Sequence, residues 1–360
     1  MGLAWQGDKI MKKFFACMVA LMVMSTTFVY ADQHSAMLEQ GDSIALFYGA
    51  DALQQAYAVA DSGAVITLSK GKFAGLTIEK SLTLVGYYGF SNDPSRATVI
   101  SGDLVVSANK TSINGVYVTE HLRLYNVSDC TIRHSWLISL NAVATGGMIH
   151  TNTIVDQCVV STHVSIPVCA WSKDFVIKNS TIRMDQAEIN NPNPIYLVNN
   201  VIYLINNNGY ASKDYTLPYG IFTNNIFVYT NDYDYSVNAD GRIETLSQKY
   251  ANTYLNNAWA RCRVSDRNYN NNRNYGTLAS VIDDVTIPQD SIFAEFHYQS
   301  LQFPAYPINP GLGSDGTPRG PLGGTGFTDR PSIPRITGRD IDLNPDAGGK
   351  LNVKITVSAE

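Results

Sequence analysis

The side chains best placed for chemistry in this 360-residue sequence are cations that recur at a regular interval. Arg133, Val155 and Lys178 each directly follow an isoleucine. If those isoleucines point inward in three consecutive turns of a repeat, Arg133 and Lys178 point outward about 10 Å apart, because neighbouring strands lie about 4.8 Å apart. Such a pair, with Arg183 nearby, would bind an anionic sugar chain. The alternative interpretation is ordinary solubilising charge.

Tyrosines form a second group of candidate binding residues, among which Tyr233 and Tyr235 stand closest together. The face of a tyrosine ring can stack on a sugar while its hydroxyl stays hydrated. Tyrosine is also a common strand residue, which is the alternative explanation for its abundance. The tyrosines of this region are Tyr203, Tyr210, Tyr215, Tyr219, Tyr229, Tyr233, Tyr235, Tyr250 and Tyr254.

Acidic residues give weaker signals for metal binding or hydrolysis. Residues 232–240 hold a group of oxygen ligands whose spacing fits no known calcium loop, so the sequence leaves open either a turn or a calcium site. That group is Asp232, Asp234, Asn238 and Asp240. The adjacent pair Asp283 and Asp284 is typical of a solvated turn. No cluster of histidine and cysteine has the spacing of a zinc site, so no other cofactor is expected.

Composition limits the possible function classes. With 26 basic and 31 acidic residues the formal net charge is -5, so there is no basic footprint for nucleic acid. Hydrophobic residues make up 45% of the chain, which is enough for a sizeable core and excludes disorder as the main state. Only 16% of residues are charged, and 27 glycines accompany many Asn, Thr and Tyr residues. This mixture favours strands and turns over helices.

A repeat provides the elements that would position these side chains. An apolar residue recurs two places before Gly, His, Asp or Asn, and successive third positions are 29, 19, 22, 23, 21 and 24 residues apart. Residues that tolerate a left-handed backbone turn the corners of a coil, and its short strands stack on those of the next turn. We expect an asparagine column to form side-chain hydrogen bonds along the stack. The predicted corner positions are Gly86, Gly115, His134, Asp156, Asn179, Asn200 and Asn224.

The two ends of the repeat have different patterns. Residues 51–60 have helical spacing with Asp51 as a plausible N-cap, and residues 65–68, 76–78 and 82–86 alternate like strands. Residues 303–349 are rich in Pro and Gly and show no strand pattern, so we expect them to wrap the last coil. Residues 351–357 alternate as one terminal strand that could cover an edge.

The runs at 52–56, 63–68, 71–73 and 78–86 resemble the start of secreted right-handed parallel β-helices of the pectin lyase-like superfamily. The segments at the other end of the chain resemble the ending of β-helix proteins secreted by Bacteroidetes, although Leu322 stands where that type has an aromatic residue before its paired glycines. Those segments are 290–293, 296–298, 311, 315–317, 320, 323–324 and 333–336. The resemblance implies a fold with a capping helix. It says little about activity, because the superfamily includes lyases, hydrolases, adhesins and scaffolds.

The N-terminus has the pattern of a secretory signal peptide. Lys12 and Lys13 precede an apolar run at 14–24, and Ala31 is the expected cleavage position. No segment is long and apolar enough to span a membrane. We therefore expect a secreted, periplasmic or surface location. The cysteines that remain after cleavage allow three disulfide pairings or buried free thiols, and the sequence does not choose; they are Cys130, Cys158, Cys169 and Cys262.

The sequence thus predicts an all-β fold: a single-stranded right-handed parallel β-helix with a short N-terminal capping helix and an irregular C-terminal tail. The expected parts are a leader at 1–31, a cap at 32–63, the β-helix at 64–300 and the tail at 301–360. The favoured function is a non-catalytic scaffold that binds a glycan or adheres to a surface. The alternative is a polysaccharide lyase or glycoside hydrolase with a divergent active site. The sequence does not determine the oligomeric state.

Overall fold

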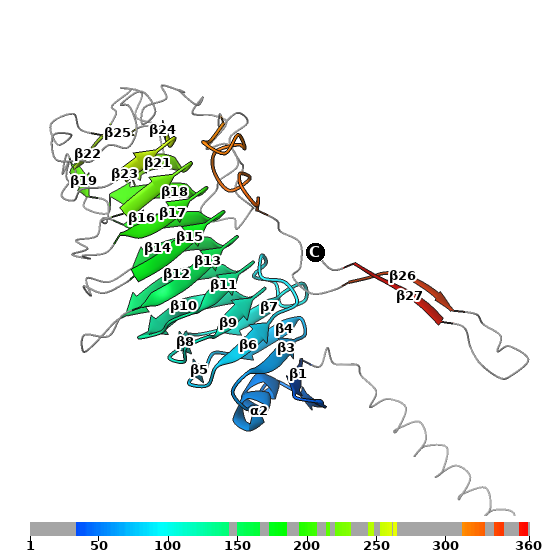
Figure 1. Cartoon of the computed structure of the whole chain (residues 1–360). Helices are drawn as coiled ribbons and strands as arrows, with labels where there is room; N and C mark the ends of the chain where they lie inside the picture. The colour runs from blue at the N-terminus through cyan, green and yellow to red at the C-terminus, as the bar shows by residue number, and fades with distance from the viewer. Residues whose placement is uncertain are drawn as a thin grey trace, which may run out of the picture. The chain divides into compact units, whose positions relative to one another are not determined.

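The chain is an all-β protein built as a parallel β-helix, which confirms the predicted fold class (Figure 1). The computed structural model describes residues 34–143, 150–165, 173–185, 194–206, 214–216, 220–231, 244–247, 253–260, 262–264, 312–327, 335–341 and 353–358. The predicted leader, Tyr233, Tyr235 and the acidic groups at 232–240 and 283–284 lie outside the described residues. Within the described part of the chain, no helix is long and apolar enough to cross a membrane.

Two large sheets form the walls of the solenoid, and each turn of chain adds one strand to each sheet. The parallel strands of the first, which we call sheet A, are β3 (Ala64–Leu68), β6 (Leu82–Val85), β9 (Ser112–Asn114), β11 (Thr131–Arg133), β13 (Thr151–Asp156), β15 (Lys173–Lys178), β17 (Ile195–Val198), β20 (Gly220–Thr223) and β23 (Thr253–Leu255). The strands of the second, sheet B, are β4 (Gly71–Ala74), β7 (Thr98–Ser101), β10 (Tyr117–Tyr125), β12 (Trp136–Val143), β14 (Val159–Ser165), β16 (Thr181–Asp185), β18 (Val201–Asn206), β21 (Ile226–Asn231) and β24 (Ala258–Ala260), with β5 (Thr77–Ile78) and β8 (Leu104–Val106) at its side.

The ends of the chain add smaller elements. Before the solenoid, β1 (Ser35–Gln40) and β2 (Ser43–Tyr48) extend sheet A in antiparallel fashion, and the predicted helix is α2 (Ala52–Val59). Strands β19 (Asp214–Thr216), β22 (Glu244–Ser247) and β25 (Cys262–Val264) form a small parallel sheet. The tail ends in an antiparallel pair, β26 (Arg335–Ile341) and β27 (Val353–Ser358). The expectation of no strand in 303–349 is therefore wrong, since β26 lies there, with a register irregularity between Ile336 and Gly338.

Each strand of sheet A from β3 to β20 directs one apolar side chain of a shared column into the solenoid. These residues stack in one column and are at most 1% exposed: Ile66, Leu84, Ile113, Ile132, Val155, Ile177, Leu197 and Phe222. The prediction that Val155 points outward is wrong, because Val155 pairs with Ile132 and Ile177. Ile154 and Val155 are both apolar, so the period-two pattern did not identify the inward residue, and a slip of one residue exchanges the two faces.

A column of residues with left-handed backbone forms the corner between sheets A and B. Their φ values lie between 45° and 71°, and the column consists of Gly115, His134, Gln157, Asn179, Asn199, Asn224 and Asn256. Two predicted corner positions are wrong by one residue: Asp156 precedes Gln157, and Asn200 follows Asn199. Gly86 precedes this series and packs against the backbone of Gly115.

Buried asparagines form a second column just beyond this corner. Asn200, Asn225 and Asn257 are fully buried. Nδ2 of Asn200 donates to Oδ1 of Asn225 at 3.0 Å, and Nδ2 of Asn225 donates to Oδ1 of Asn257 at 3.0 Å. The expected hydrogen bonds between stacked asparagines therefore exist, and Asn200 takes part in them as predicted. Asn225 stands where Asn224 was expected, and the predicted member Asn179 instead bonds to the C-terminal segment.

The C-terminal segment 312–327 lies along the corner across several turns. The backbone N–H of Ser314 donates to Oδ1 of Asn224 at 2.9 Å, and the hydroxyl of Thr325 donates to Oδ1 of Asn179 at 2.9 Å. Figure 1 shows this segment in orange beside the later turns. Asn179 and Asn224 thus use their side chains to hold the tail.

Candidate functional site

The two predicted cations do share one column on the outside of sheet A, but an acidic residue stands between them. Arg133, Asp156 and Lys178 are paired neighbours at the ends of β11, β13 and β15. The carboxylate oxygen Oδ2 of Asp156 lies 3.4 Å from Nε of Arg133 and 3.5 Å from Nζ of Lys178. The sequence pattern does not reveal this arrangement, because it predicts Val155 and not Asp156 in the outward column.

The three side chains of the Arg133–Asp156–Lys178 column differ in how far they are exposed. The side chain of Asp156 is 5% exposed, whereas those of Arg133 and Lys178 are 47% and 29% exposed. Oδ1 of Asp156 is buried without a hydrogen-bond partner. The two cations therefore form the surface of the column, and the carboxylate beneath them holds both in place.

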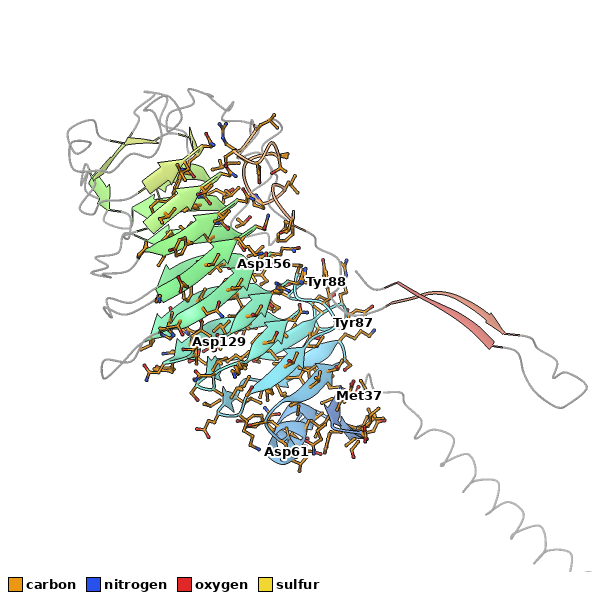
Figure 2. All side chains as sticks on the ribbon, viewed as in Figure 1. Met37, Asp61, Tyr87, Tyr88, Asp129 and Asp156 are labelled. Carbon is orange, nitrogen blue, oxygen red and sulfur yellow. The ribbon has the colours of Figure 1, made fainter. Side chains whose placement is uncertain are left out.

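Figure 2 shows Asp156, the middle residue of the column, where the strands of sheet A end. Asp156 marks the edge next to the left-handed corner, and Asp129 marks the opposite edge, where the chain enters β11. Gly115, His134 and Gln157 each donate a backbone hydrogen bond to the carbonyl of one column residue, at 3.1, 3.3 and 3.1 Å. The backbone of the column is therefore held by the strand pairing of consecutive turns.

A half-buried apolar column lies next to these charges on the same outer face. It consists of Ile154, Val176, Tyr196 and Ile221, which are paired neighbours on β13, β15, β17 and β20. Tyr196 supplies an aromatic ring in the turn after Lys178. The outer face of sheet A thus combines two exposed cations with an apolar strip and one aromatic side chain.

The third predicted cation is not part of this face. Arg183 belongs to β16 of sheet B, and it is only 8% exposed. Its neighbour in β18 is Tyr203, which is 4% exposed and whose pKa is raised by burial. Arg183 is therefore not placed to bind the same ligand as Arg133 and Lys178.

A second polar cluster, which the sequence analysis missed, lies where β8 and β10 meet. Oδ1 of Asp103 accepts a hydrogen bond from the backbone N–H of His121 at 3.1 Å and lies 2.9 Å from Nδ1 of the same residue. Oδ2 of Asp103 lies 2.9 Å from a guanidinium nitrogen of Arg123. Glu120 adds a second carboxylate, and Asp103, Glu120 and His121 each place one potential ligand atom within 4.8 Å of the others.

The electrostatics of this cluster favour an ionised carboxylate beside the imidazole. Burial alone would raise the pKa of Asp103, but the hydrogen bonds from His121 and the charge of Arg123 outweigh it and lower that pKa. A carboxylate on Nδ1 orients a histidine so that Nε2 can accept a proton. Since Asp103 and His121 direct these atoms at each other, the arrangement favours an oriented histidine over a shared metal ion.

A local irregularity in the strand pairing marks the position of this cluster. The pairing of β10 with β12 shifts register between Val118 and His121, and such bulges often redirect side chains near active sites. His121 and Arg123 alternate with the buried residues Leu122 and Leu124. The sequence did not reveal their partner Asp103, because it comes from the preceding turn.

The described cysteines do not take part in either cluster. Cys130 and Cys158 are free and buried, so they are not bonded to each other. Burial raises the pKa of both thiols, that of Cys158 to about 12. A neutral buried thiol is a poor nucleophile, and these two residues act as small apolar groups.

Comparison with protein-family models, with curated proteins and with solved structures finds no match to this chain. The strand pairing itself therefore establishes the parallel β-helix. The features that bear on function are the Arg133–Asp156–Lys178 column and the Asp103–His121 cluster.

Proposed function

We propose that this protein is an exported, non-catalytic β-helix scaffold that binds an acidic polysaccharide along the outer face of sheet A. The observation that carries the proposal is the Arg133–Asp156–Lys178 column, whose exposed groups are both cations. Guanidinium and ammonium groups bind carboxylates and sulfates through charge-assisted hydrogen bonds. The leader pattern supports export.

Spacing supports an extended ligand over a single sugar. Arg133 and Lys178 are two strands apart, about 10 Å, along the direction in which the turns stack. Tyr196 lies in the next turn on the same face, where its ring is available for sugar stacking. A chain of negatively charged sugars that runs along the stack would contact all three side chains.

The test is binding of acidic and neutral polysaccharides to the wild-type protein and to Arg133→Gln and Lys178→Gln. Each single variant leaves Asp156 one cationic partner, so the fold should remain intact. Loss of one charge-assisted contact, worth about 1.5–3 kcal/mol, should weaken binding of the acidic ligand about tenfold or more. Lys72→Gln is the matched control, because Lys72 is an exposed cation on sheet B. Equal binding of neutral and acidic chains, or equal loss in the control, would overturn the proposal.

The second candidate function is a polysaccharide lyase or glycoside hydrolase. The observation that favours it is the Asp103–His121 pair with Glu120 and Arg123 beside it, because an oriented histidine can serve as a general base. Removal of the proton next to a uronate carboxylate, with cleavage of the glycosidic C–O bond on the neighbouring carbon and protonation of the leaving oxygen, would give an unsaturated sugar and a shortened chain. Hydrolysis would instead use the two carboxylates and release a new reducing end.

Assays for both products distinguish this candidate from pure binding. Ultraviolet absorption detects the unsaturated sugar, and a reducing-end assay detects hydrolysis. If the cluster is catalytic, His121→Ala should abolish turnover, and Asp103→Asn should change its pH profile. His134→Asn is the control, because asparagine tolerates the left-handed backbone at that corner and His134 lies outside the cluster. Binding without turnover of any acidic polysaccharide would exclude the enzyme.

A further inference from the structure

Strand β2 is an uncovered edge of sheet A. It is the first strand in the sheet order, and β1 is its one neighbour among the described strands. Three large apolar side chains on this strand are unusually exposed: Ile44 at 68%, Leu46 at 55% and Tyr48 at 55%. Met37 of β1, labelled in Figure 2, lies opposite Leu46 and shows where this edge is.

The same three residues also direct their backbone groups away from β1. The backbone N–H of Gly49 donates to the carbonyl of His34 at 2.8 Å. Residues that hydrogen-bond to the neighbouring strand alternate in an antiparallel pair. Counting back from Gly49 in steps of two, Phe47, Ala45 and Ser43 are the residues that bond to β1. The residues between them, Ile44, Leu46 and Tyr48, therefore present their N–H and C=O groups to the open edge.

This edge lacks the features that normally prevent strand pairing. Exposed edges are usually protected by charges, proline or a bulge. Residues 43–48 contain no charge and no proline, and the pairing of β1 with β2 has no register irregularity. Phe47, on the other face of the strand, packs against the core and anchors β2. An apolar edge held in place in this way is suited to a partner strand.

We propose that β2 pairs with β2 of a second copy of this chain, antiparallel, about a two-fold axis at Leu46. In this register Leu46 meets the partner's Leu46, and Ile44 meets the partner's Tyr48. Large apolar side chains then face each other in the pairs that Ile44, Leu46 and Tyr48 form, and three backbone N–H groups from each copy find acceptors. Asp42 meets the partner's Ala50, so no like charges oppose each other.

The sequence of β2 favours a second copy over another partner. A two-fold contact uses the same patch on both molecules, so that patch must complement itself. The alternating pattern of Ile44, Leu46 and Tyr48 does so, because reversing its direction places a large apolar residue opposite each of its members. The two-fold contact also leaves neither copy of β2 with an open edge.

The test is the mass of the purified chain in solution, measured by sedimentation with and without the predicted leader. A dimer is expected for both forms. Leu46→Lys should give a folded monomer, because two ammonium groups would meet at the axis. Leu312→Lys is the matched control, since Leu312 is 65% exposed but lies in the tail, and this variant should stay dimeric. Circular dichroism shows whether each variant is folded.

A crosslinking variant tests the register independently. Residues of a hydrogen-bonded pair in an antiparallel sheet, such as Leu46 and the partner's Leu46 in this register, have Cα atoms about 5.5 Å apart. This distance is within the range of a disulfide. Leu46→Cys should therefore form a covalent dimer on mild oxidation, whereas Leu312→Cys should not. A wild-type chain that stays monomeric at all concentrations would overturn the proposal. So would a Leu46→Lys variant that remains dimeric, or open-ended fibres instead of a closed dimer.

Discussion

Replacing Asn225 with alanine tests whether the buried asparagine column holds the later turns together. Asn225 is fully buried, and its Nδ2 donates to the carbonyl of Leu197 at 2.7 Å and to Oδ1 of Asn257 at 3.0 Å. Its Oδ1 accepts from the backbone N–H of Asn200 at 2.9 Å and from Nδ2 of the same residue at 3.0 Å. One side chain thus joins three successive turns.

The expected cost follows from the backbone groups that lose their partners. Alanine would leave the buried carbonyl of Leu197 and the buried N–H of Asn200 without these hydrogen bonds. A buried polar group without a partner costs about 1–3 kcal/mol, so the two together cost about 2–6 kcal/mol. Domains are commonly stable by about 5–15 kcal/mol, so this single change should remove a large share of the stability.

The assay is urea denaturation combined with hydrogen exchange. Repeat proteins derive their stability from interfaces between neighbouring units, so exchange should accelerate first in β17, β20 and β23. Asn152→Gly is the matched control, because Asn152 is an exposed left-handed asparagine whose side chain bonds to Asp129 at 2.7 Å. Glycine keeps that backbone conformation and should cost about 1 kcal/mol or less. If Asn225→Ala costs no more than this control, the reasoning is refuted.

Three further predictions concern buried groups. Burial raises the pKa of Cys158 from 9.0 to about 12. The free energy of unfolding should therefore keep its full value below pH 9.0 and decrease as the pH rises toward 12. In urea titrations, Cys158→Ala should show a smaller decrease over this range. Burial lowers the pKa of His150 below 6.5, so stability should fall as the pH drops below 6.5, and His150→Asn should fall less steeply in the same titration. A Cβ on Gly89 would lie 2.5 Å from the carbonyl oxygen of His134, so Gly89→Ala should cost about 1–3 kcal/mol, and an unchanged melting temperature would contradict this.

The solenoid was predictable because its corners demand particular residues. Gly and Asn adopt left-handed backbone far more easily than other residues do, so Gly115, Asn179 and Asn224 stand out at regular intervals. Gln157 does not stand out, because glutamine is not a typical left-handed residue. The repeat therefore predicts the corner at the neighbouring Asp156. That slip of one residue also put Val155 in the outward column.

The candidate sites were only partly predictable, because they combine residues from different turns. The positions of Arg133 and Lys178 followed from the repeat, but the carboxylate between them depended on the register of β13. Asp103 and His121 are 18 residues apart and meet where a bulge interrupts the repeat. The regular spacing of a repeat does not show where the repeat is interrupted. The edge strand β2 lies before the repeat, so the spacing does not predict it either.

The position of the Arg133–Asp156–Lys178 column explains how a rigid solenoid would bind a chain of sugars. The three residues end consecutive strands, and corner residues of the adjacent turns bind their carbonyls. Their spacing is therefore set by strand pairing before a ligand arrives, and Asp156 restrains both cationic side chains in advance. Preorganisation lowers the entropy lost on binding, so two cations can contribute more than two mobile surface lysines would. If β2 joins two chains, each dimer carries two such columns, and a long polysaccharide that reaches both would gain avidity without any new contact.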